Sequence, residues 1–274
     1  MSEMYSYQYP HPAVTTDCVI FGFDGSAMNI LLVERGIEPF KGSWALPGGF
    51  LKMDETVEQG ALRELHEETG VTDVFLEQFH VFSDVKRDPR ERVLTVAFLA
   101  LVRKNSYQLI AGDDASEAEW FEWNNLPPLA FDHADIIQLA RKCLQQKLRI
   151  QPIAFKLLNN VFKMSELQLI YELIHGTTYD RRNFARKMQA SGFVHEVPDG
   201  VAEELDLHEE NALYGTVAML EKNICYSCDE MLPKPEGGPK KQSRGRTATL
   251  FTFNEEEFEK AQNSQDWRKF PLDF

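Results

Sequence analysis

The chain has 274 residues, a length that favours two domains, and 43% of its residues are hydrophobic, which is enough for ordinary packed cores. Its formal net charge of −14 argues against a protein that coats nucleic acid over its whole surface, although a single basic face would still permit DNA binding. The sequence has no apolar run of about 18 residues, no secretory signal and only four scattered cysteines, so we expect no membrane span, no disulfide framework and a reducing, cytoplasmic location.

The first half begins with two segments, 14–24 and 28–34, whose apolar and β-branched residues predict strands joined by a Gly-Ser turn. A loop rich in glycine and proline follows. The apolar spacing of residues 56–69 then predicts a helix, and Gly70 stands where a helix C-cap is expected.

Further strands are predicted at 92–102 and 117–123, followed by a helix that starts near Asp132, whose side chain we expect to cap it. Strand-rich sequence with two well-marked helices predicts an α/β/α sandwich over residues 1–150.

Residues 151–274 form the second predicted domain. Segments 164–176 and 181–194 have the pattern of two helices joined by a tight turn, which is typical of a helix-turn-helix. A strand predicted at 247–253 would add the wing of a winged helix-turn-helix. The sequence therefore predicts an α/β protein in which a sandwich precedes a winged helix.

Clustered carboxylates distinguish the first predicted helix. Glu64 lies three and four positions before Glu67 and Glu68, so the three side chains share one face and repel one another. A hard divalent cation would offset this repulsion, and Gly49 in the preceding loop would let the backbone approach it closely. The alternative is a solvated helix face carrying charge.

The order of these residues decides between the two interpretations. Gly49 is followed after five residues by Glu55, and after seven more by Arg63-Glu64-Leu65, one residue, Glu67-Glu68, one residue and Gly70-Val71. This pattern resembles the Nudix box, and residues 12–148 resemble the Nudix hydrolase superfamily. The resemblance implies that Mg²⁺ or Mn²⁺ is held by Glu64, Glu67, Glu68 and the carbonyl of Gly49, with Glu55 and Arg63 as orienting residues.

The same resemblance implies metal-assisted attack of water on a diphosphate. Glu64 would act as the general base, or a carboxylate outside the box such as Glu117, which is otherwise a surface residue at a strand start. The box is intact, which favours retained hydrolysis over ligand sensing alone.

The ligand class is suggested by the segment after the box, which is similar to that of ADP-ribose pyrophosphatase-like members. Arg87, Arg90 and Arg92 are candidates for contacting a phosphate, because guanidinium groups match phosphate oxygens; otherwise they are ordinary turn charges. Trp44 is a candidate for stacking on a base, with core packing as its alternative. We expect a nucleotide-type small molecule.

The second half resembles the winged helix-turn-helix of the Nudix-related transcriptional regulators, and residues 245–253 resemble the wing strand of that family. This resemblance implies double-stranded DNA as a partner and, together with the Nudix resemblance, a homodimer. A recognition helix presents its first residues to base edges, and a wing contacts phosphates. The basic residues in these positions are Arg181, Arg182, Arg186 and Lys187 on the helix, and Arg244 and Arg246 in the wing.

One segment departs from the regulator pattern. Residues 195–243 form a long, acidic insertion that contains Cys225 and Cys228, a pair that would need two further ligands to hold zinc. Acidic charge near phosphates opposes DNA binding. Two hypotheses therefore stand: a regulator coupled to a Nudix domain, or a plain Nudix pyrophosphatase with an accessory C-terminal domain.

Overall fold

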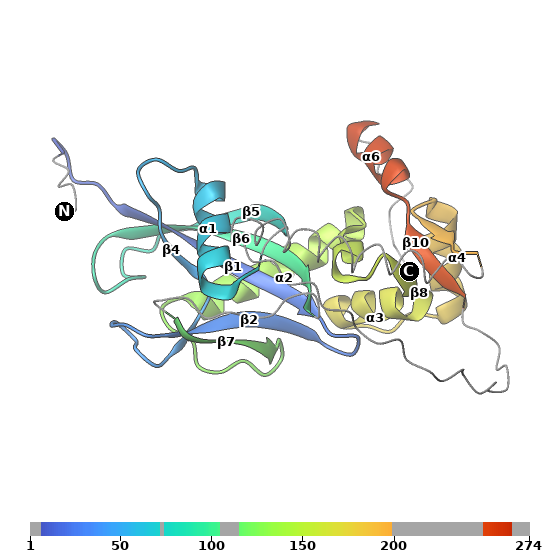
Figure 1. Ribbon diagram of the computed structural model, residues 1–274, viewed down its shortest axis with the longest axis horizontal. Helices are drawn as coiled ribbons and strands as arrows, with labels where there is room; N and C mark the ends of the chain where they lie inside the picture. Colours follow the sequence, from blue (N-terminus) through green and yellow to red (C-terminus); the bar gives the residue numbers. More distant parts are fainter. Residues whose placement is uncertain (1–6, 72–73, 105–114, 199–248, 265–274) are drawn as a thin grey trace, which may run out of the picture.

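The computed structural model describes residues 7–71, 74–104, 115–198 and 249–264 (Figure 1). The first part comprises β1 (Ala13–Phe23), β2 (Met28–Arg35), β3 (Trp44–Ala45), β4 (Gly48–Phe50), α1 (Val57–Thr69), β5 (Phe75–Phe82), β6 (Val93–Arg103), β7 (Ala115–Glu122) and α2 (His133–Ile150). The second part comprises the 3-10 helix η2 (Ile153–Leu157), β8 (Val161–Lys163), α3 (Met164–His175), α4 (Arg181–Ser191), β9 (Val194–Glu196), β10 (Leu250–Phe253) and α6 (Glu255–Ser264).

The first part is built on one mixed sheet in the order β3-β2-β1-β6-β5, with β4 also pairing with β1 and β7 with β2. The central strands β1 and β6 run parallel, from Ala13 opposite Val93 to Phe23 opposite Arg103. Both are largely apolar along their length, as strands buried on both faces must be.

Alternation along β1 sends successive side chains to opposite layers. Cys18 and Ile20 pack with Ala61 and Leu65 of α1, whereas Val19 and its alternate neighbours pack against α2. The two helices therefore cover opposite faces of the sheet (Figure 1), which confirms the predicted α/β/α sandwich.

Local chemistry fixes the ends of α1. Thr56 and Gln59 form a capping box, in which the Thr56 N–H donates to Gln59 Oε1 at 2.8 Å and the Gln59 N–H donates to Thr56 Oγ1 at 3.3 Å. The N–H of Gly70 donates to the carbonyl of His66 and closes the helix. Both ends agree with the helix that the sequence predicts.

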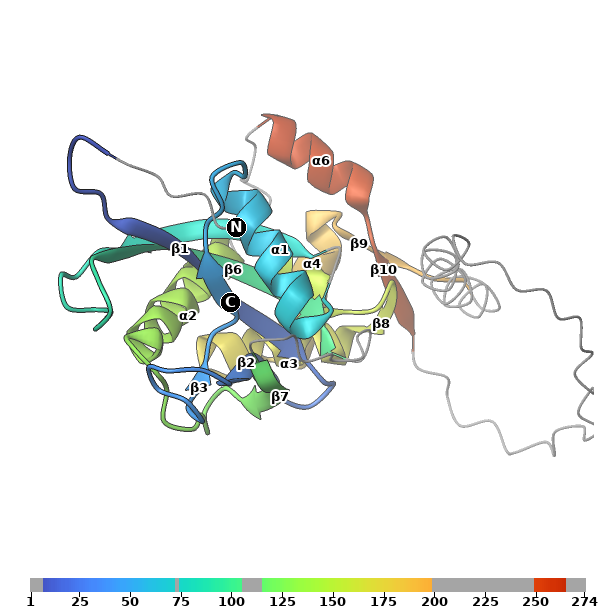
Figure 2. The ribbon, with the colours of Figure 1, turned by 60° about the vertical axis from the view of Figure 1, so that its left-hand side comes forward.

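The second part lies at one end of the sandwich and joins α3 and α4 to the three-stranded antiparallel sheet β8-β10-β9 (Figures 1 and 2). This arrangement confirms the predicted winged helix-turn-helix. The predicted helix 181–194 was too long: α4 ends at Ser191 because Gly192 adopts a left-handed conformation with φ 78°, and Val194 begins β9.

The described part of the predicted wing strand, β10, begins at Leu250, and residues 247 and 248 lie outside the described residues. Arg244, Arg246, Cys225 and Cys228 lie outside the described residues, as does most of the predicted insertion.

The helix α2 links the two parts. Its residues Leu144 and Leu148 belong to one hydrophobic cluster that continues into Ile170 and Ile174 of α3. The predicted domain boundary after residue 150 falls within this continuous packing and stays a prediction. Among the described helices, none combines the length and apolar character that crossing a membrane requires.

Candidate metal and nucleotide site

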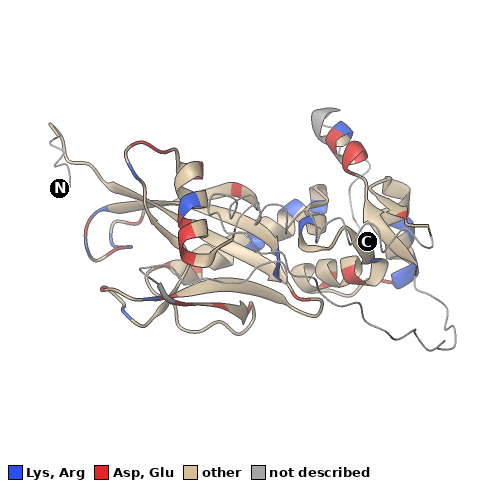
Figure 3. Ribbon diagram, viewed as in Figure 1, with Lys and Arg blue, Asp and Glu red and all other residues tan. Residues whose placement is uncertain are grey.

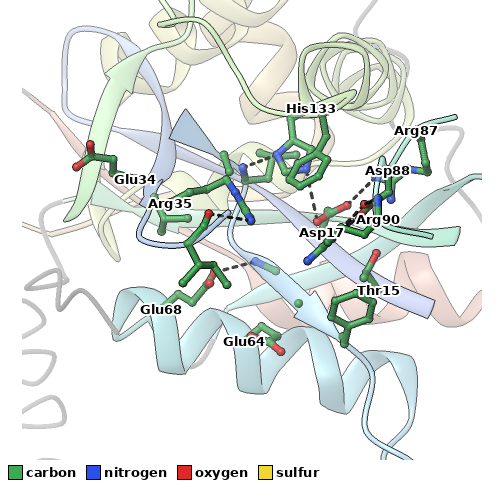
Figure 4. A pocket seen from close by; sticks show the side chains of 18 of the residues that line it. Thr15, Asp17, Glu34, Arg35, Glu64, Glu68, Arg87, Asp88, Arg90 and His133 are labelled. Atoms are coloured by element: carbon green, nitrogen blue, oxygen red, sulfur yellow. Dashed lines mark hydrogen bonds and ion pairs between the residues drawn. The ribbon is translucent and has the colours of Figure 1, made fainter. Parts of the chain in front are cut away.

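A cavity of about 300 Å³ opens beside the first turns of α2 and the middle of α1 (Figure 4). Six segments far apart in the sequence meet here: β1, the end of β2, the glycine loop from β3 to β4, α1, the loop 83–92 and the start of α2. The charged side chains that line it include Asp17, Arg35, Glu64, Glu68, Arg87 and Arg90.

Arg63 organises the carboxylates of α1. It binds Glu55 through two nitrogens, with Nη2 at 2.6 Å from Oε1 and Nε at 2.9 Å from Oε2. Its Nη1 also lies 2.7 Å from Glu64 Oε1 and 3.0 Å from Glu67 Oε2. Hydrogen bonds from Arg63 lower the pKa of Glu55 to about 2, so this carboxylate stays charged and holds the guanidinium in place.

The glycine loop approaches the carboxylates closely. The N–H of Gly48 donates to Glu68 Oε2 at 2.8 Å. A Cβ added at Gly49 would lie 2.6 Å from the carboxyl carbon of Glu64, so a side chain at this position would displace that carboxylate. Glycine at 49 thus lets the loop approach Glu64 closely without displacing its carboxylate.

The donor set fits a hard divalent cation. Burial, the largest influence, raises the pKa of Glu64, because its charged form has lost part of its hydration; a nearby cation would offset this cost. Glu64 and Glu68 line the cavity, while the side chain of Glu67 is 52% exposed. Among the described residues, no three acidic, histidine or cysteine side chains form a ready cage. Mg²⁺ does not need one, since it is commonly held by one or two carboxylates, waters and substrate phosphates.

The three arginines of the loop 83–92 have different surroundings. Arg87 is buried and binds two carboxylates: Nη2 lies 3.2 Å from Asp17 Oδ2 and 2.8 Å from Asp132 Oδ1. Arg90 lines the cavity and pairs with Asp88 at 2.7 Å. Arg92 donates instead to the backbone carbonyls of residues 83 and 84 and does not line the cavity.

Asp132 corrects a sequence expectation. It stands at the N-cap position of α2, but its side chain makes no capping hydrogen bond. Both carboxylate oxygens accept from Arg87 instead, with Nε at 3.0 Å from Oδ2. A guanidinium fork offers a carboxylate two charge-assisted hydrogen bonds, which outweigh one bond to a backbone N–H.

Two further candidates lie away from the cavity. The ring of Trp44 packs edge-on against Phe121, with centroids 4.7 Å apart, and belongs to the margin of the hydrophobic core. Glu117 is exposed on β7, opposite Glu34. The geometry of Trp44 corresponds to the core-packing alternative, and its role in binding a base stays a prediction.

Sequence reasoning missed several cavity residues. Asp17 is a lone acid in a buried strand, and this contradiction of the apolar pattern was a usable signal. His133 Nδ1 accepts from the N–H of Leu46 at 2.8 Å, and burial lowers the pKa of the imidazole. We assign the proton to Nε2, which lies 3.8 Å from Asp17 Oδ1. Arg35 left no local signal.

The basic residues of α4 have a different setting (Figure 3). Arg181, Arg182 and Arg186 are exposed, and Lys187 is partly exposed, whereas the opposite face buries Phe184 and Met188. Asp180 caps the helix by accepting from the N–H of residue 183 at 2.9 Å. The winged helix therefore presents a basic helix face to solvent.

Each half of the chain matches a known protein family. Residues 11–140 match the NUDIX domain, and residues 154–204 match the NrtR DNA-binding winged helix domain. A protein of Acinetobacter baylyi described as "ADPR responsive transcriptional repressor NtrR" is 37% identical over 203 residues, which cover 72% of this chain and 80% of that relative. The chain belongs to the NrtR family of Nudix-related transcriptional regulators.

Two further relatives are similar to this NrtR family chain, one over its Nudix half and one over most of its length. An ADP-ribose pyrophosphatase of Methanocaldococcus jannaschii is 47% identical over 130 residues, which cover 47% of this chain and 73% of that protein. The crystal structure of Shewanella oneidensis NrtR complexed with a 27mer DNA matches with a TM-score of 0.65 and 27% identity, covering 90% of this chain and 95% of that one.

Membership of the NrtR family confirms the resemblance that the sequence suggested for each half. Nudix hydrolases generally use a divalent metal, which agrees with the oxygen donors at α1. The alternative of a plain pyrophosphatase with an accessory domain loses its basis, because the second half matches a DNA-binding family.

Proposed function

We propose that this protein is a DNA-binding transcriptional repressor whose Nudix domain responds to ADP-ribose or a related nucleoside diphosphate-linked metabolite. The observation that carries this proposal is the course of α2. Its 18 residues run from the cavity to the helix-turn-helix, a span of about 27 Å at 1.5 Å per residue. One rigid element thus touches both the ligand cavity and the DNA-binding half.

At the cavity end, α2 begins directly after Asp132, the residue that Arg87 binds. Both oxygens of Asp132 are held by this guanidinium, at 2.8 and 3.0 Å. A ligand that changes the position of the loop 83–92 would therefore displace the first turn of α2.

At the other end, α2 contacts the C-terminal end of α3, which precedes the turn into the recognition helix. Gln145 Nε2 donates to the carbonyl of Ile174 at 2.7 Å, and the carbonyl of Gln145 lies 3.3 Å from His175 Nε2. His175 Nδ1 lies 2.7 Å from the Tyr179 hydroxyl, one residue before the Asp180 cap of α4. A shift of α2 would reach the first turn of α4 through this contact.

The test measures affinity for duplex fragments from the upstream region of the protein's own operon by fluorescence anisotropy, with and without ADP-ribose. Saturating ADP-ribose should weaken DNA binding by about 5- to 150-fold, and DNA should weaken ligand binding by the same factor. Absence of duplex binding at about 50 mM salt, or an unchanged affinity with ligand, would overturn the proposal.

We also propose that the intact box hydrolyses its ligand. Glu64, Glu68 and the carbonyl of Gly49 would hold Mg²⁺ or Mn²⁺, with Glu67 as a further ligand; the ion would polarise the diphosphate and activate water. Arg63 keeps the carboxylates in place, Glu55 anchors Arg63, and the Gly48 N–H fixes Glu68. Release of AMP from ADP-ribose that depends on Mg²⁺ tests this, and no release with either metal would contradict it.

Three features of the proposal need their own measurements. We expect a homodimer in a cytoplasmic setting, and sedimentation would report the dimer. We place the division between a Nudix domain and a DNA-binding domain after residue 150. Arg244 and Arg246 in the wing remain candidates for DNA contact, beside the four basic residues of α4.

A further inference from the structure

Two arginines share one aromatic ring at the rim of the cavity. The Cζ of Arg35 lies 4.9 Å from the ring centroid of Phe131, and the Cζ of Arg90 lies 5.6 Å from the same centroid. Arg90 also lies over Phe50 at 5.0 Å. Arg35 ends β2, Arg90 belongs to the loop 83–92, and Phe131 precedes α2. The Phe131 ring therefore contacts two cationic side chains from separate parts of the chain.

The electrostatic situation of Arg35 differs from that of its neighbours. Its Nε donates to the carbonyl of Pro39 at 2.8 Å and its Nη2 to that of Ile37 at 3.5 Å, which are neutral acceptors. The other arginines that line the cavity each bind a carboxylate: Arg63, Arg87 and Arg90. Within the described residues, no ion pair of Arg35 is found.

Arg35 is thus a cation without a carboxylate partner among the described residues, whereas the other arginines that line the cavity each have one. Burial lowers the pKa of its guanidinium and the nearby charge of Arg90 lowers it further, against smaller opposing effects of the carboxylates of Glu68, Asp88 and Asp17. Arg35 and Arg90 are like charges held close together, and of the two only Arg90 has a carboxylate in ion-pair contact within the described chain, so an anion that binds Arg35 would offset their repulsion. Of the ligand's parts, only its phosphates bring negative charge.

The backbone around the ring is also unusual. Phe131 has φ 51° and Phe40 has φ 64°, and these are the non-glycine residues with positive φ in the described chain. Their rings meet edge-to-face with centroids 4.8 Å apart. Bulky residues adopt this conformation at a cost in free energy, and such strain gathers at ligand sites. The contact holds the Phe131 ring within reach of both guanidinium groups.

We propose that Phe131 is a positioning residue that holds Arg35 and Arg90 together over its ring, so that Arg35 binds a phosphoryl oxygen of the diphosphate opposite the carboxylates of α1. This deepens the proposed function and rests on it. It assigns the phosphate contact to Arg35, whereas Arg87 serves to anchor α2.

The test uses isothermal titration of the full chain with an α,β-methylene analogue of ADP-ribose, whose bridge cannot be hydrolysed, and, separately, with inorganic pyrophosphate, both in Mg²⁺. Arg35→Ala should weaken both ligands by about tenfold or more, because a charge-assisted hydrogen bond is lost. Phe131→Leu should weaken both by about fivefold, and Phe131→Tyr, which keeps the ring, should bind like the parent chain. An effect on the ADP-ribose analogue alone would overturn the phosphate assignment.

A double-mutant cycle separates positioning from general damage to the fold. If Phe131 acts through Arg35, then Phe131→Leu added to Arg35→Ala should cause little further loss of pyrophosphate affinity. Additive losses would overturn the positioning role, and Arg35→Ala tests the phosphate contact even if Phe131→Leu fails to fold. If the parent chain binds neither ligand, the proposed function itself fails; if it binds both and Arg35→Ala matches it, only this assignment fails.

Discussion

The two halves of the molecule use arginine in opposite ways. In the Nudix half, Arg87 is buried within 3.2 Å of two carboxylates, and Arg63 reaches three more. In the winged helix, Arg181 and Arg182 are exposed and form no ion pair within the described chain. The comparison teaches that a buried, matched guanidinium fixes geometry, whereas an exposed one remains free to meet phosphates.

The largest expected effect is on stability and concerns Arg87, the buried arginine of this comparison. Arg87→Met removes the partner of Asp17 and Asp132 and leaves two largely buried carboxylates uncompensated. We expect the free energy of unfolding to fall by about 3–5 kcal/mol, measured by urea denaturation. Arg92→Met is the matched control from the same loop, because its guanidinium reaches only backbone carbonyls; it should cost less than about 1 kcal/mol. Equal losses would remove the distinction.

Local features of this structure could be predicted from the sequence, whereas contacts between distant residues could not. Helix α1 was predictable because its capping box, apolar face and glycine end are local signals. The pairing of Arg87 with Asp17 was not, since the two residues are 70 positions apart and only the fold brings them together. The overlong prediction for α4 arose because Phe193 and Val194 continue the apolar pattern, although they pack into the core from beyond the helix.

A slightly smaller effect is expected from the carboxylates of α1. Glu68→Gln removes a charge that would hold the cation, so metal-dependent release of AMP should fall by about 100-fold or more, while duplex binding without ligand is kept. Glu67→Gln should act in the same direction. The control Glu58→Gln changes an exposed glutamate in the first turn of the same helix and should retain turnover. Removal of metal with EDTA should reproduce the loss in the parent chain.

The exposed arginines of α4 predict a defect in DNA binding that leaves hydrolysis unchanged. Arg182→Ala should weaken duplex binding by about 5- to 10-fold and reduce its salt dependence by about one phosphate contact, with turnover unchanged. Lys142→Ala, an exposed cation on α2, should leave DNA binding as it was. Anisotropy titrations at several salt concentrations measure both, and equal effects of the two variants would show that general charge, not the face of α4, attracts DNA.

The smallest effect concerns the contact between the halves. Gln145→Ala removes the side chain that donates to the carbonyl of Ile174, so the two ends of α2 should communicate less well. DNA affinity without ligand and ADP-ribose affinity without DNA should both stay close to those of the parent chain. The factor by which ADP-ribose weakens DNA binding should shrink by about 2- to 30-fold, which corresponds to about 0.5–2 kcal/mol of coupling.

The neighbouring Gln146→Ala provides the control, because this side chain is exposed and has no hydrogen bond to α3 within the described residues. It should keep the full coupling. If both variants keep it, the hydrogen bond from Gln145 to Ile174 does not carry the coupling between the cavity and the recognition helix. If only Gln145→Ala weakens the coupling, the hydrogen bond from Gln145 to Ile174 carries much of the effect of ADP-ribose on DNA binding.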